Sequence, residues 1–339
     1  MAMISLERRL MLMENLGAYL SANEPAWREA VSRAGLFNPW FIEPFVDHAV
    51  SQICSRFLEP ALLRSWASGF TFLNGRERNH TVGLVMAGNI PLVGFHDFLC
   101  VFLSGYRMKI KLSQKDEILW NHILSLLLQW EPGLEDRIAT GGPLPGCDAY
   151  IATGSNGSAR YFEYYFSSRP SLIRRNRTSV AWVDGHESRA ELEGLARDIL
   201  LYFGMGCRSV TQVWVPTGYD FLPLLEATAP FGFLADHHRY RNNLDYRLAL
   251  LVLNRTPYMS RPHLLLVEDS SPFSPIGVLH YHYYEGARPA GLRPEERQDL
   301  QCIVGGDGIA WGNSQLPGLS DWADGVNTMD FLGSLQTRL

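Results

Sequence analysis

Several features common in other protein classes are missing from this 339-residue sequence. It has no surplus of basic residues, because 30 Lys and Arg stand against 35 Asp and Glu and give a net charge of −5. A nucleic-acid-binding protein usually has such a surplus, so we expect no nucleic-acid partner. No run of about 18 or more apolar residues occurs, and we therefore expect no transmembrane segment.

Paired cysteines are missing as well. The five cysteines are widely spaced and form no Cys-x-x-Cys motif, which argues against a disulfide framework and against a zinc site. Residues 1–20 mix charged residues among the apolar ones, so we expect no secretory signal. These absences predict a cytoplasmic protein without a metal site and with at most one thiol of special reactivity.

The hydrophobic pattern that is present predicts an α/β fold with a helical N-terminus. Apolar residues recur at helical spacing through residues 1 to about 70. From residue 81, β-branched runs alternate with helical segments, which predicts a parallel sheet covered on both faces, and the pattern restarts after Cys207 as a second α/β unit. The expected strands are 81–87, 106–112, 148–152, 180–183, 210–215, 248–254, 263–268 and 276–283, and the expected helices are 93–103, 116–129, 158–166, 189–203 and 219–228.

Cys207 is the residue best placed for covalent chemistry. It lies in Phe-Gly-Met-Gly-Cys-Arg-Ser (203–209), between an expected helix and an expected strand. The glycines permit a close backbone approach, so that backbone N–H groups can face a substrate oxygen, and the neighbouring Arg208 favours a thiolate. Most free cysteines are small buried hydrophobic residues instead, and the local sequence leaves both interpretations open.

Four further segments follow expected strands, where open α/β sheets bind ligands. In Gly-Asn-Ile-Pro (88–91), Asn89 either donates to an oxyanion or caps the next helix. In Lys-Ile-Lys-Leu-Ser (109–113), Lys111 either reaches a dinucleotide or belongs to an ordinary amphipathic edge. The Gly/Ser turn at 153–158 can hold phosphate at a helix N-terminus, although it is not G-x-G-x-x-G. The segment 268–277 (EDSSPFSPIG), taken alone, is only a loop.

Taken in order, these segments resemble the aldehyde-dehydrogenase superfamily, and more closely its acyl-CoA reductase branch, which includes the fatty-acid reductase subunit of bacterial luminescence. The resemblance extends from about residue 81 to residue 333. GNIP is similar to the superfamily's Asn-x-Pro turn, KIKLS to its Lys-Pro-Ser cofactor motif, ATGS (152–155) to its Thr-Gly-Ser turn and EDSSPFSPIG to its Glu-x-Phe-Gly-Pro segment. FGMGCRS and the tail LPGLSDWADGVNTMDFL (316–332) are similar to the reductase branch.

The resemblance implies an aldehyde-dehydrogenase-like fold and a set of site residues. Its domains would be a helical segment with a Rossmann-type NAD(P)-binding domain over 1–203, an α/β catalytic domain over 204–310 and a tail over 311–339 that packs back on the body. Cys207 would be the nucleophile, Asn89 would help to bind the oxyanion and Glu268 would hold the nicotinamide ribose. The other implied cofactor-binding residues are Lys111, Ser113, Thr153, Gly154 and Ser155.

One departure from the superfamily pattern indicates the direction of the reaction. Hydrolytic members carry a glutamate in a Glu-Leu-Gly-Gly-Lys segment upstream of the cysteine, whereas the comparable stretch here, 172–177 (LIRRNR), has no carboxylate. The resemblance therefore implies NADPH-dependent reduction of an acyl thioester to an aldehyde through a cysteine acyl-enzyme. The acyl donor would be acyl-CoA or an acyl-carrier protein, and NADPH rather than NADH follows only from the family and the biosynthetic direction.

Two other functions stay open. One is an NAD(P)-dependent aldehyde dehydrogenase that works oxidatively, against which the missing glutamate speaks. The other is a non-catalytic acyl-binding subunit of a reductase complex, against which the presence of Asn89, Cys207 and Glu268 speaks. The luminescence relatives work with partner subunits, so an acyl-activating partner enzyme is one expectation, and a homodimer is the default for such an enzyme. The basic stretch 169–177 is either a solvated loop or a contact for an anionic ligand.

Overall fold

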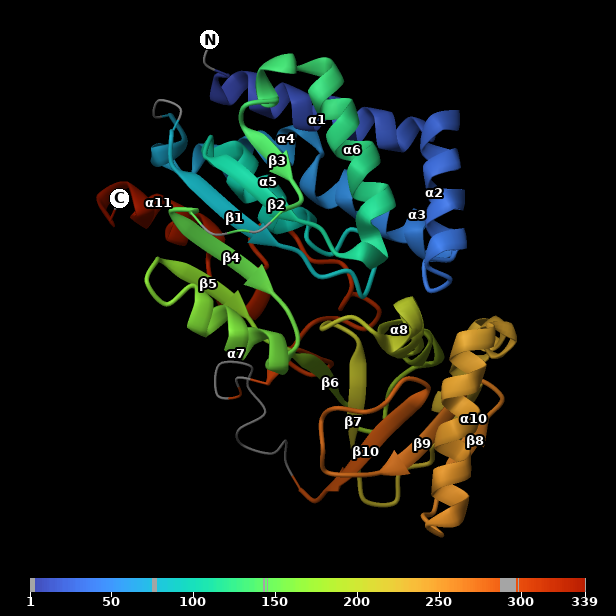
Figure 1. The fold of residues 1–339 in the computed structure, drawn as a ribbon. Coiled ribbons are helices and arrows are strands. Elements are labelled where there is room, and N and C mark those ends of the chain that lie inside the picture. The colour runs from blue at the N-terminus through green and yellow to red at the C-terminus, as the bar shows by residue number, and fades with distance from the viewer. Residues whose placement is uncertain are drawn as a thin grey trace. The chain divides into compact units, whose positions relative to one another are not determined.

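The structure is a computed structural model that describes residues 4–74, 78–142, 144, 146–286, 297 and 299–338. The chain divides into two compact units. Unit 1 consists of Met1–Asn176 together with Gly318–Leu339, and unit 2 consists of Arg177–Pro317. Each unit contains one β-sheet with helices beside it (Figure 1).

The N-terminal part of unit 1 is helical, as the apolar spacing predicts. Ser5 caps the first helix by accepting a hydrogen bond from the backbone N–H of Arg8, and Asn23 ends that helix in the left-handed conformation. Proline at the first turn starts each of the next helices. These elements are α1 (Leu6–Ala22), α2 (Pro25–Phe37), α3 (Glu43–Gln52), the π-helical turn η1 (Ile53–Phe57), α4 (Pro60–Ser68) and the 3₁₀ turn η2 (Thr71–Asn74).

The sheet of unit 1 has five parallel strands in the order β3-β2-β1-β4-β5. The central strand has Val82 and Leu84 almost fully buried, as expected of a parallel strand that is covered on both faces. The strands are β1 (Thr81–Val85), β2 (Arg107–Lys111), β3 (Ile138–Thr140), β4 (Ala149–Thr153) and β5 (Ser171–Arg174). The accompanying helices are α5 (Phe95–Ser104), α6 (Glu117–Trp130), α7 (Asn156–Tyr165) and the C-terminal α11 (Thr328–Arg338), with the short turns η3 (Gln114–Asp116), η4 (Pro132–Leu134) and η8 (Ala323–Gly325).

The sheet of unit 2 has six strands in the order β11-β6-β7-β10-β9-β8, of which β8 runs antiparallel to β9 and the others pair in parallel. The strands are β6 (Thr178–Trp182), β7 (Val210–Pro216), β8 (Met259–Arg261), β9 (Leu264–Glu268), β10 (Val278–Tyr284) and β11 (Leu300–Val304). The helical elements are α8 (Arg189–Leu200), η5 (Leu201–Gly204), α9 (Leu222–Ala227), η6 (Ala229–Asp236) and α10 (His238–Leu253).

One predicted strand is wrong. Residues 248–253 form the end of α10 rather than a strand, and Asn254 is its C-cap. The run Leu-Ala-Leu-Leu-Val-Leu is short and continuously apolar, and such a run does not distinguish a strand from a helix. Residues upstream indicate a helix. Tyr240 and Leu244 are buried four positions apart, and Leu248 follows them on the same helical face.

The boundary between the two units differs from the one expected at 203/204. It lies at Asn176/Arg177, because β6 pairs with β7 on one side and with β11 on the other and so belongs to the second sheet. The C-terminal segment from Gly318 belongs to unit 1, where α11 packs against α5. Within the described residues, no helix is both long enough and apolar enough to span a membrane.

Candidate functional site

The sheet of unit 1 brings six of the predicted site residues to one edge. Because β2, β1 and β4 are adjacent and parallel, their carboxyl ends meet at that edge. Lys111 is the last residue of β2 and is exposed, and Thr153 is the last residue of β4. Asn89 follows β1 and is half-buried. The remaining members of this group are Ser113, Gly154 and Ser155, which follow directly after the same strands.

The turn that carries Asn89 is held by Ser113 and Asp116, two residues that follow β2. A Cβ on Gly88 would lie 2.5 Å from the Oγ of Ser113, so only glycine permits this close approach. Leu92, just after the turn, has a φ of 53°, a region that bulky residues rarely adopt. Its backbone N–H donates to Asp116 Oδ2 at 2.8 Å.

Asp116 is a site residue that the sequence reasoning missed. It is only 2% exposed, and burial raises the pKa of its carboxyl well above the usual value. A buried carboxyl that bonds to a strained turn can hold that turn in one conformation. In the sequence, Asp116 only marked the beginning of an expected helix, because its partner Leu92 is 24 positions away.

The Gly/Ser turn in unit 1 forms the start of α7. Ser155 is the N-cap, and its Oγ accepts a hydrogen bond from the Ser158 N–H at 3.2 Å. The N–H of Ala159 bonds to the carbonyl oxygen of Ser155. Gly157, in the first turn, is exposed, and an added Cβ would meet only the Ser155 Oγ within 4 Å. This helix N-terminus is open to an anionic group.

Cys207 lies in unit 2 between η5 and β7, and it is half-buried. Two bulky residues before it, Tyr202 and Phe203, have φ values of 53° and 58°, which marks stored backbone strain. A tight turn follows, in which the Ser209 N–H bonds to the Gly206 carbonyl at 3.0 Å and the Gly206 N–H bonds to the Ser209 Oγ at 3.1 Å. The nucleophile candidate is therefore held on a rigid turn.

Residues from other elements hold this turn in place, and the sequence reasoning missed them. Ser179 on β6 donates from its Oγ to the carbonyl oxygen of Cys207 at 3.0 Å. The same Oγ lies 2.9 Å from the Sγ of Cys302 on β11. Gln315 donates from its Nε2 to the Ser209 Oγ at 3.1 Å. Each contact joins residues more than 25 positions apart, so no local pattern could have revealed it.

The other four cysteines are poorly suited to act as nucleophiles. Cys100, Cys147 and Cys302 are buried, and Cys54 is half-buried. Burial raises the pKa of all four thiols, that of Cys302 to about 11. A raised pKa lowers the thiolate fraction near neutral pH. Cys207 is therefore the cysteine that accessibility and backbone placement favour.

Glu268, the predicted ribose-binding residue, is exposed at the end of β9. The loop after it turns back to the start of β7, a few residues beyond Cys207. Gln212 on β7 donates from its Nε2 to the carbonyl oxygens of Asp269 and Ser271, at 2.9 and 3.2 Å, and the Thr211 hydroxyl donates to the carbonyl oxygen of Pro272. Unit 2 thus fixes the segment after Glu268 against the strand that follows Cys207.

The stretch that lacks the superfamily glutamate contains a buried arginine. Arg174, at the end of β5, is 3% exposed, and its guanidinium donates to both oxygens of Asp97, at 2.7 and 3.0 Å. A further hydrogen bond reaches the Thr328 hydroxyl at 2.8 Å. Arg174 thus forms a buried ion pair inside unit 1.

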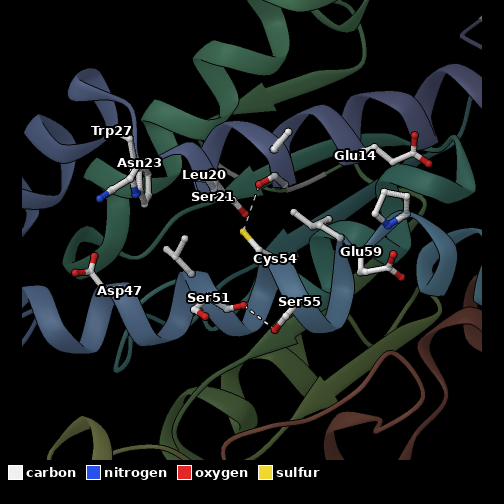
Figure 2. A pocket seen from close by; sticks show the side chains of 15 residues that line it. Glu14, Leu20, Ser21, Asn23, Trp27, Asp47, Ser51, Cys54, Ser55 and Glu59 are labelled. Atoms are coloured by element: carbon white, nitrogen blue, oxygen red, sulfur yellow. Dashed lines mark hydrogen bonds between the residues drawn. The ribbon is translucent and has the colours of Figure 1, made fainter.

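A separate groove lies in the helical part of unit 1. Figure 2 shows Cys54 in its centre, between α1 and the α3–η1 segment, with Glu14 and Glu59 toward one end and Asp47 toward the other. Its volume is about 680 Å³. The carboxylates already have protein partners: Glu14 pairs with Arg64, Asp47 with Arg28, and Glu59 accepts the Leu62 N–H. None of the predicted site residues is among the described residues that line this groove.

Sequence comparisons find no similar protein, whereas structure comparisons find solved proteins with a similar fold. No protein-family model matches the chain, and no curated protein matches it in sequence. A putative aldehyde dehydrogenase from Burkholderia cenocepacia is similar in structure, with a TM-score of 0.62 at 13% identity over 83% of this chain and 70% of that one. The Mycobacterium tuberculosis aldehyde dehydrogenase complexed with NAD+ gives 0.62 at 14% identity, over 88% and 72% of the two chains.

A third solved structure extends the same likeness. The aldehyde dehydrogenase from Bacillus cereus, solved as an NAD+ complex, has a TM-score of 0.62 at 11% identity over 88% of this chain and 71% of that one. The fold of this chain is therefore aldehyde-dehydrogenase-like, as the motif order predicts. The roles of Cys207, Asn89, Glu268 and the cofactor residues stay predictions, since a fold supports many activities.

Proposed function

We propose that this protein reduces an acyl thioester to an aldehyde, with Cys207 as the acyl-accepting nucleophile and NADPH as the reductant. The observation that carries the proposal is the placement of Cys207. It is half-buried on a rigid turn that is bonded to Ser179 and braced by Gln315, in a fold similar to that of aldehyde dehydrogenases. The stretch 172–177, which the resemblance compares with the glutamate segment of hydrolytic members, has no carboxylate and contains the buried ion pair of Arg174. This supports reduction over hydrolysis of the acyl-enzyme.

In the proposed reaction, the thiolate of Cys207 attacks the thioester carbonyl. A new bond forms between its Sγ and the acyl carbon, and after collapse of the tetrahedral adduct the donor thiolate leaves. The Cys207 backbone N–H and the Asn89 amide would stabilise the oxyanion. A reduced nicotinamide supplies a hydride to the acyl carbon. The resulting thiohemiacetal oxyanion would collapse, breaking its bond to Sγ, and release the aldehyde with Cys207 as the thiolate, while the departed donor thiolate takes up a proton from solvent.

The residues of unit 1 fit a dinucleotide. The open N-terminus of α7 suits a phosphate group, because its first N–H groups have no intrahelical acceptor. The ammonium of Lys111 is exposed at the end of β2, which is separated by β1 from the strand β4 that precedes α7. It suits a ribose hydroxyl or a 2′-phosphate. The similar proteins from Mycobacterium tuberculosis and Bacillus cereus were solved with NAD+. NADPH is proposed here because the reaction is written in the reductive direction.

The second candidate is NAD+-dependent oxidation of an aldehyde, which the NAD+ complexes of the similar structures favour. That reaction also forms an acyl-enzyme on the cysteine, but it needs a base to activate water for release. Arg174 is ion-paired with Asp97 in the stretch where such a base is expected. Release of the acyl group by hydride therefore agrees better with these residues than release by water.

The proposal is tested by measuring NADPH absorbance with a series of acyl-CoA thioesters. Wild type is compared with Cys207→Ala and with Cys54→Ala, which removes the other half-buried thiol. We expect thioester-dependent oxidation of NADPH and formation of aldehyde in wild type and in Cys54→Ala, with at least about 10³-fold loss in Cys207→Ala.

Three outcomes would contradict the proposal. The first is thioester reduction that persists in Cys207→Ala. The second is the absence of acyl transfer to folded wild-type protein from acyl-CoA and from acyl-carrier protein. The third is efficient NAD+-dependent release of carboxylic acid from an aldehyde, which would favour the second candidate.

A further inference from the structure

The outer face of α7 carries an unusual group of exposed aromatic side chains. Tyr161, Tyr164 and Tyr165 are 67%, 77% and 69% exposed. They are spaced i, i+3 and i+4 and therefore share one face of the helix. The opposite face packs inward, where Ala159 is buried and Phe162 stacks on Phe166. Large side chains that are this exposed and contiguous mark an interaction surface.

Three arginines lie on α7 or within ten residues after its end. Arg160, Arg169 and Arg175 are all exposed. Arg175 pairs with Glu163, while no ion pair of Arg160 or Arg169 is found among the described residues. Two positive charges are thus uncompensated on a protein whose net charge is −5. We call the three tyrosines with Arg160 and Arg169 the α7 surface.

The strand beside α7 ends the sheet. β5 pairs with β4 on one side only, because it is the last strand in the order β3-β2-β1-β4-β5. Figure 1 shows α7 and β5 side by side, in agreement with their contacts. An exposed helix next to a sheet edge offers a partner protein both side chains and backbone groups. Tyrosine and arginine are also the residue types that contribute most to protein interfaces.

We propose that the α7 surface docks an acidic acyl-carrier protein that delivers the thioester, an inference that rests on the proposed function. Acyl-carrier proteins are small acidic proteins, so their charge complements Arg160 and Arg169 and would oppose the acidic remainder of this chain. The convex, tyrosine-rich helix suits a protein face rather than a small molecule, which needs a concave site. A second copy of this chain would bring like charges together when the same surfaces meet.

The test compares two donors that deliver the same acyl group to the same cysteine. Kinetics are measured with hexadecanoyl-CoA and with hexadecanoyl-carrier protein for wild type, for Arg160→Glu combined with Arg169→Glu, and for Tyr161→Ser combined with Tyr164→Ser. The matched controls are Arg239→Glu and Tyr246→Ser on α10, which are also exposed. We expect KM for the carrier-protein donor to rise about tenfold or more in both α7 variants. KM for the CoA donor should change less than about twofold.

Ionic strength provides a second kinetic readout. Because the proposed contact depends on exposed charges, KM for the carrier-protein donor should rise with added salt in wild type. This salt dependence should weaken in the Arg160→Glu, Arg169→Glu variant. Equal effects of the α7 substitutions on both donors would overturn the inference, since they would indicate binding of the coenzyme phosphates or damage to the fold.

Binding measured directly separates this inference from the proposed function. Carrier protein is titrated into wild type and the same variants, with calorimetry as the readout. Binding that is lost in the α7 variants and kept in the α10 controls supports docking even if neither donor is reduced. Turnover of acyl-CoA without any binding of carrier protein overturns docking and leaves the function intact. Conversion of a dimer to a monomer by the tyrosine substitutions, with unchanged carrier-protein kinetics, assigns the surface to a second copy and also overturns docking.

Discussion

At the scale of single residues, burial makes the other four cysteines poor nucleophiles. Burial raises the pKa of the thiols of Cys54, Cys100, Cys147 and Cys302, so each is mostly protonated near neutral pH. The alkylation rate of a cysteine follows its thiolate fraction and its accessibility. The order in which the five cysteines are alkylated can therefore be predicted without knowing the substrate.

Iodoacetamide at pH 7.5 is expected to modify Cys207 first, ahead of the other four thiols, with peptide mass spectrometry over a time course as the measurement. The Cys207→Ala variant should lose the fastest adduct and keep the slower ones. Because Cys54 is the other half-buried thiol, an adduct that appears first on Cys54 would contradict this ranking.

A second prediction concerns Asp116 and pH. Its folded-state pKa is raised by burial, so the stability linked to it is fully present below the unfolded-chain value of about 3.9 and is lost as the pH rises above that value. Asp116→Asn keeps an acceptor for the Leu92 N–H and cannot ionise. We expect the free energy of unfolding of Asp116→Asn, relative to wild type, to increase between pH 5 and pH 8 in urea titrations.

Asp116→Ala serves as the comparison for that experiment. It leaves the buried Leu92 N–H without its acceptor, which costs about 1–3 kcal/mol, and it should be less stable than Asp116→Asn at every pH. A constant difference in unfolding free energy between wild type and Asp116→Asn from pH 5 to pH 8 would show that Asp116 is not held neutral.

At the scale of elements, the sequence identifies strands with strong local signals and misses those without. The β-branched apolar run at β1 and the Gly105 stop after α5 are local features, and both elements lie where they are expected. The strands β3 and β8 have only three residues each, and β5 is a four-residue strand at a sheet edge that begins with the exposed Ser171. Short or edge strands form because a neighbour pairs with them, which no local pattern records.

The turn between β1 and α5 supports a third prediction. Gly88→Ala would place a Cβ 2.5 Å from the Ser113 Oγ and 2.6 Å from the Ser113 Cβ, so the turn or its neighbour must move. We expect a loss of about 1–3 kcal/mol in the free energy of unfolding. Gly232→Ala is the control, because an added Cβ there meets no atom within 4 Å. Urea unfolding that is equal for the two variants would show that the turn adapts freely.

At the scale of the whole molecule, the sequence predicted which segments carry the site but not what holds them. Strand-end motifs are local, and adjacency of β2, β1 and β4 then brings Lys111, Asn89 and Thr153 to one edge. Ser179 and Gln315 act on the Cys207 turn through contacts that span 28 and 106 positions. Such contacts depend on the tertiary fold, so sequence patterns cannot supply them. Asn89 belongs to unit 1 and Cys207 to unit 2, and their cooperation stays a prediction.

The buried cluster of Arg174, Asp97 and Thr328 joins β5, α5 and α11, three elements that are far apart in the sequence. Burial opposes ionisation of Asp97, but the charge and hydrogen bonds of Arg174 outweigh it, so the pKa of Asp97 is lowered. The stability that this pair provides is therefore present above the unfolded-chain pKa of Asp97 and is lost as the pH falls through the folded value. Either Arg174→Met or Asp97→Leu leaves one buried charge alone.

Each single substitution is expected to cost about 3–5 kcal/mol of unfolding free energy at pH 7, and the double variant much less than the sum of the two. Urea unfolding of the four proteins closes the double-mutant cycle. The Thr328 hydroxyl, which bonds to both partners, should contribute less than either charge, so Thr328→Val is a graded control of the same cluster. Strict additivity of Arg174→Met and Asp97→Leu would show that the pair does not hold the C-terminal helix to the sheet. A large coupling energy would show that Arg174 and Asp97 stabilise the fold as a pair.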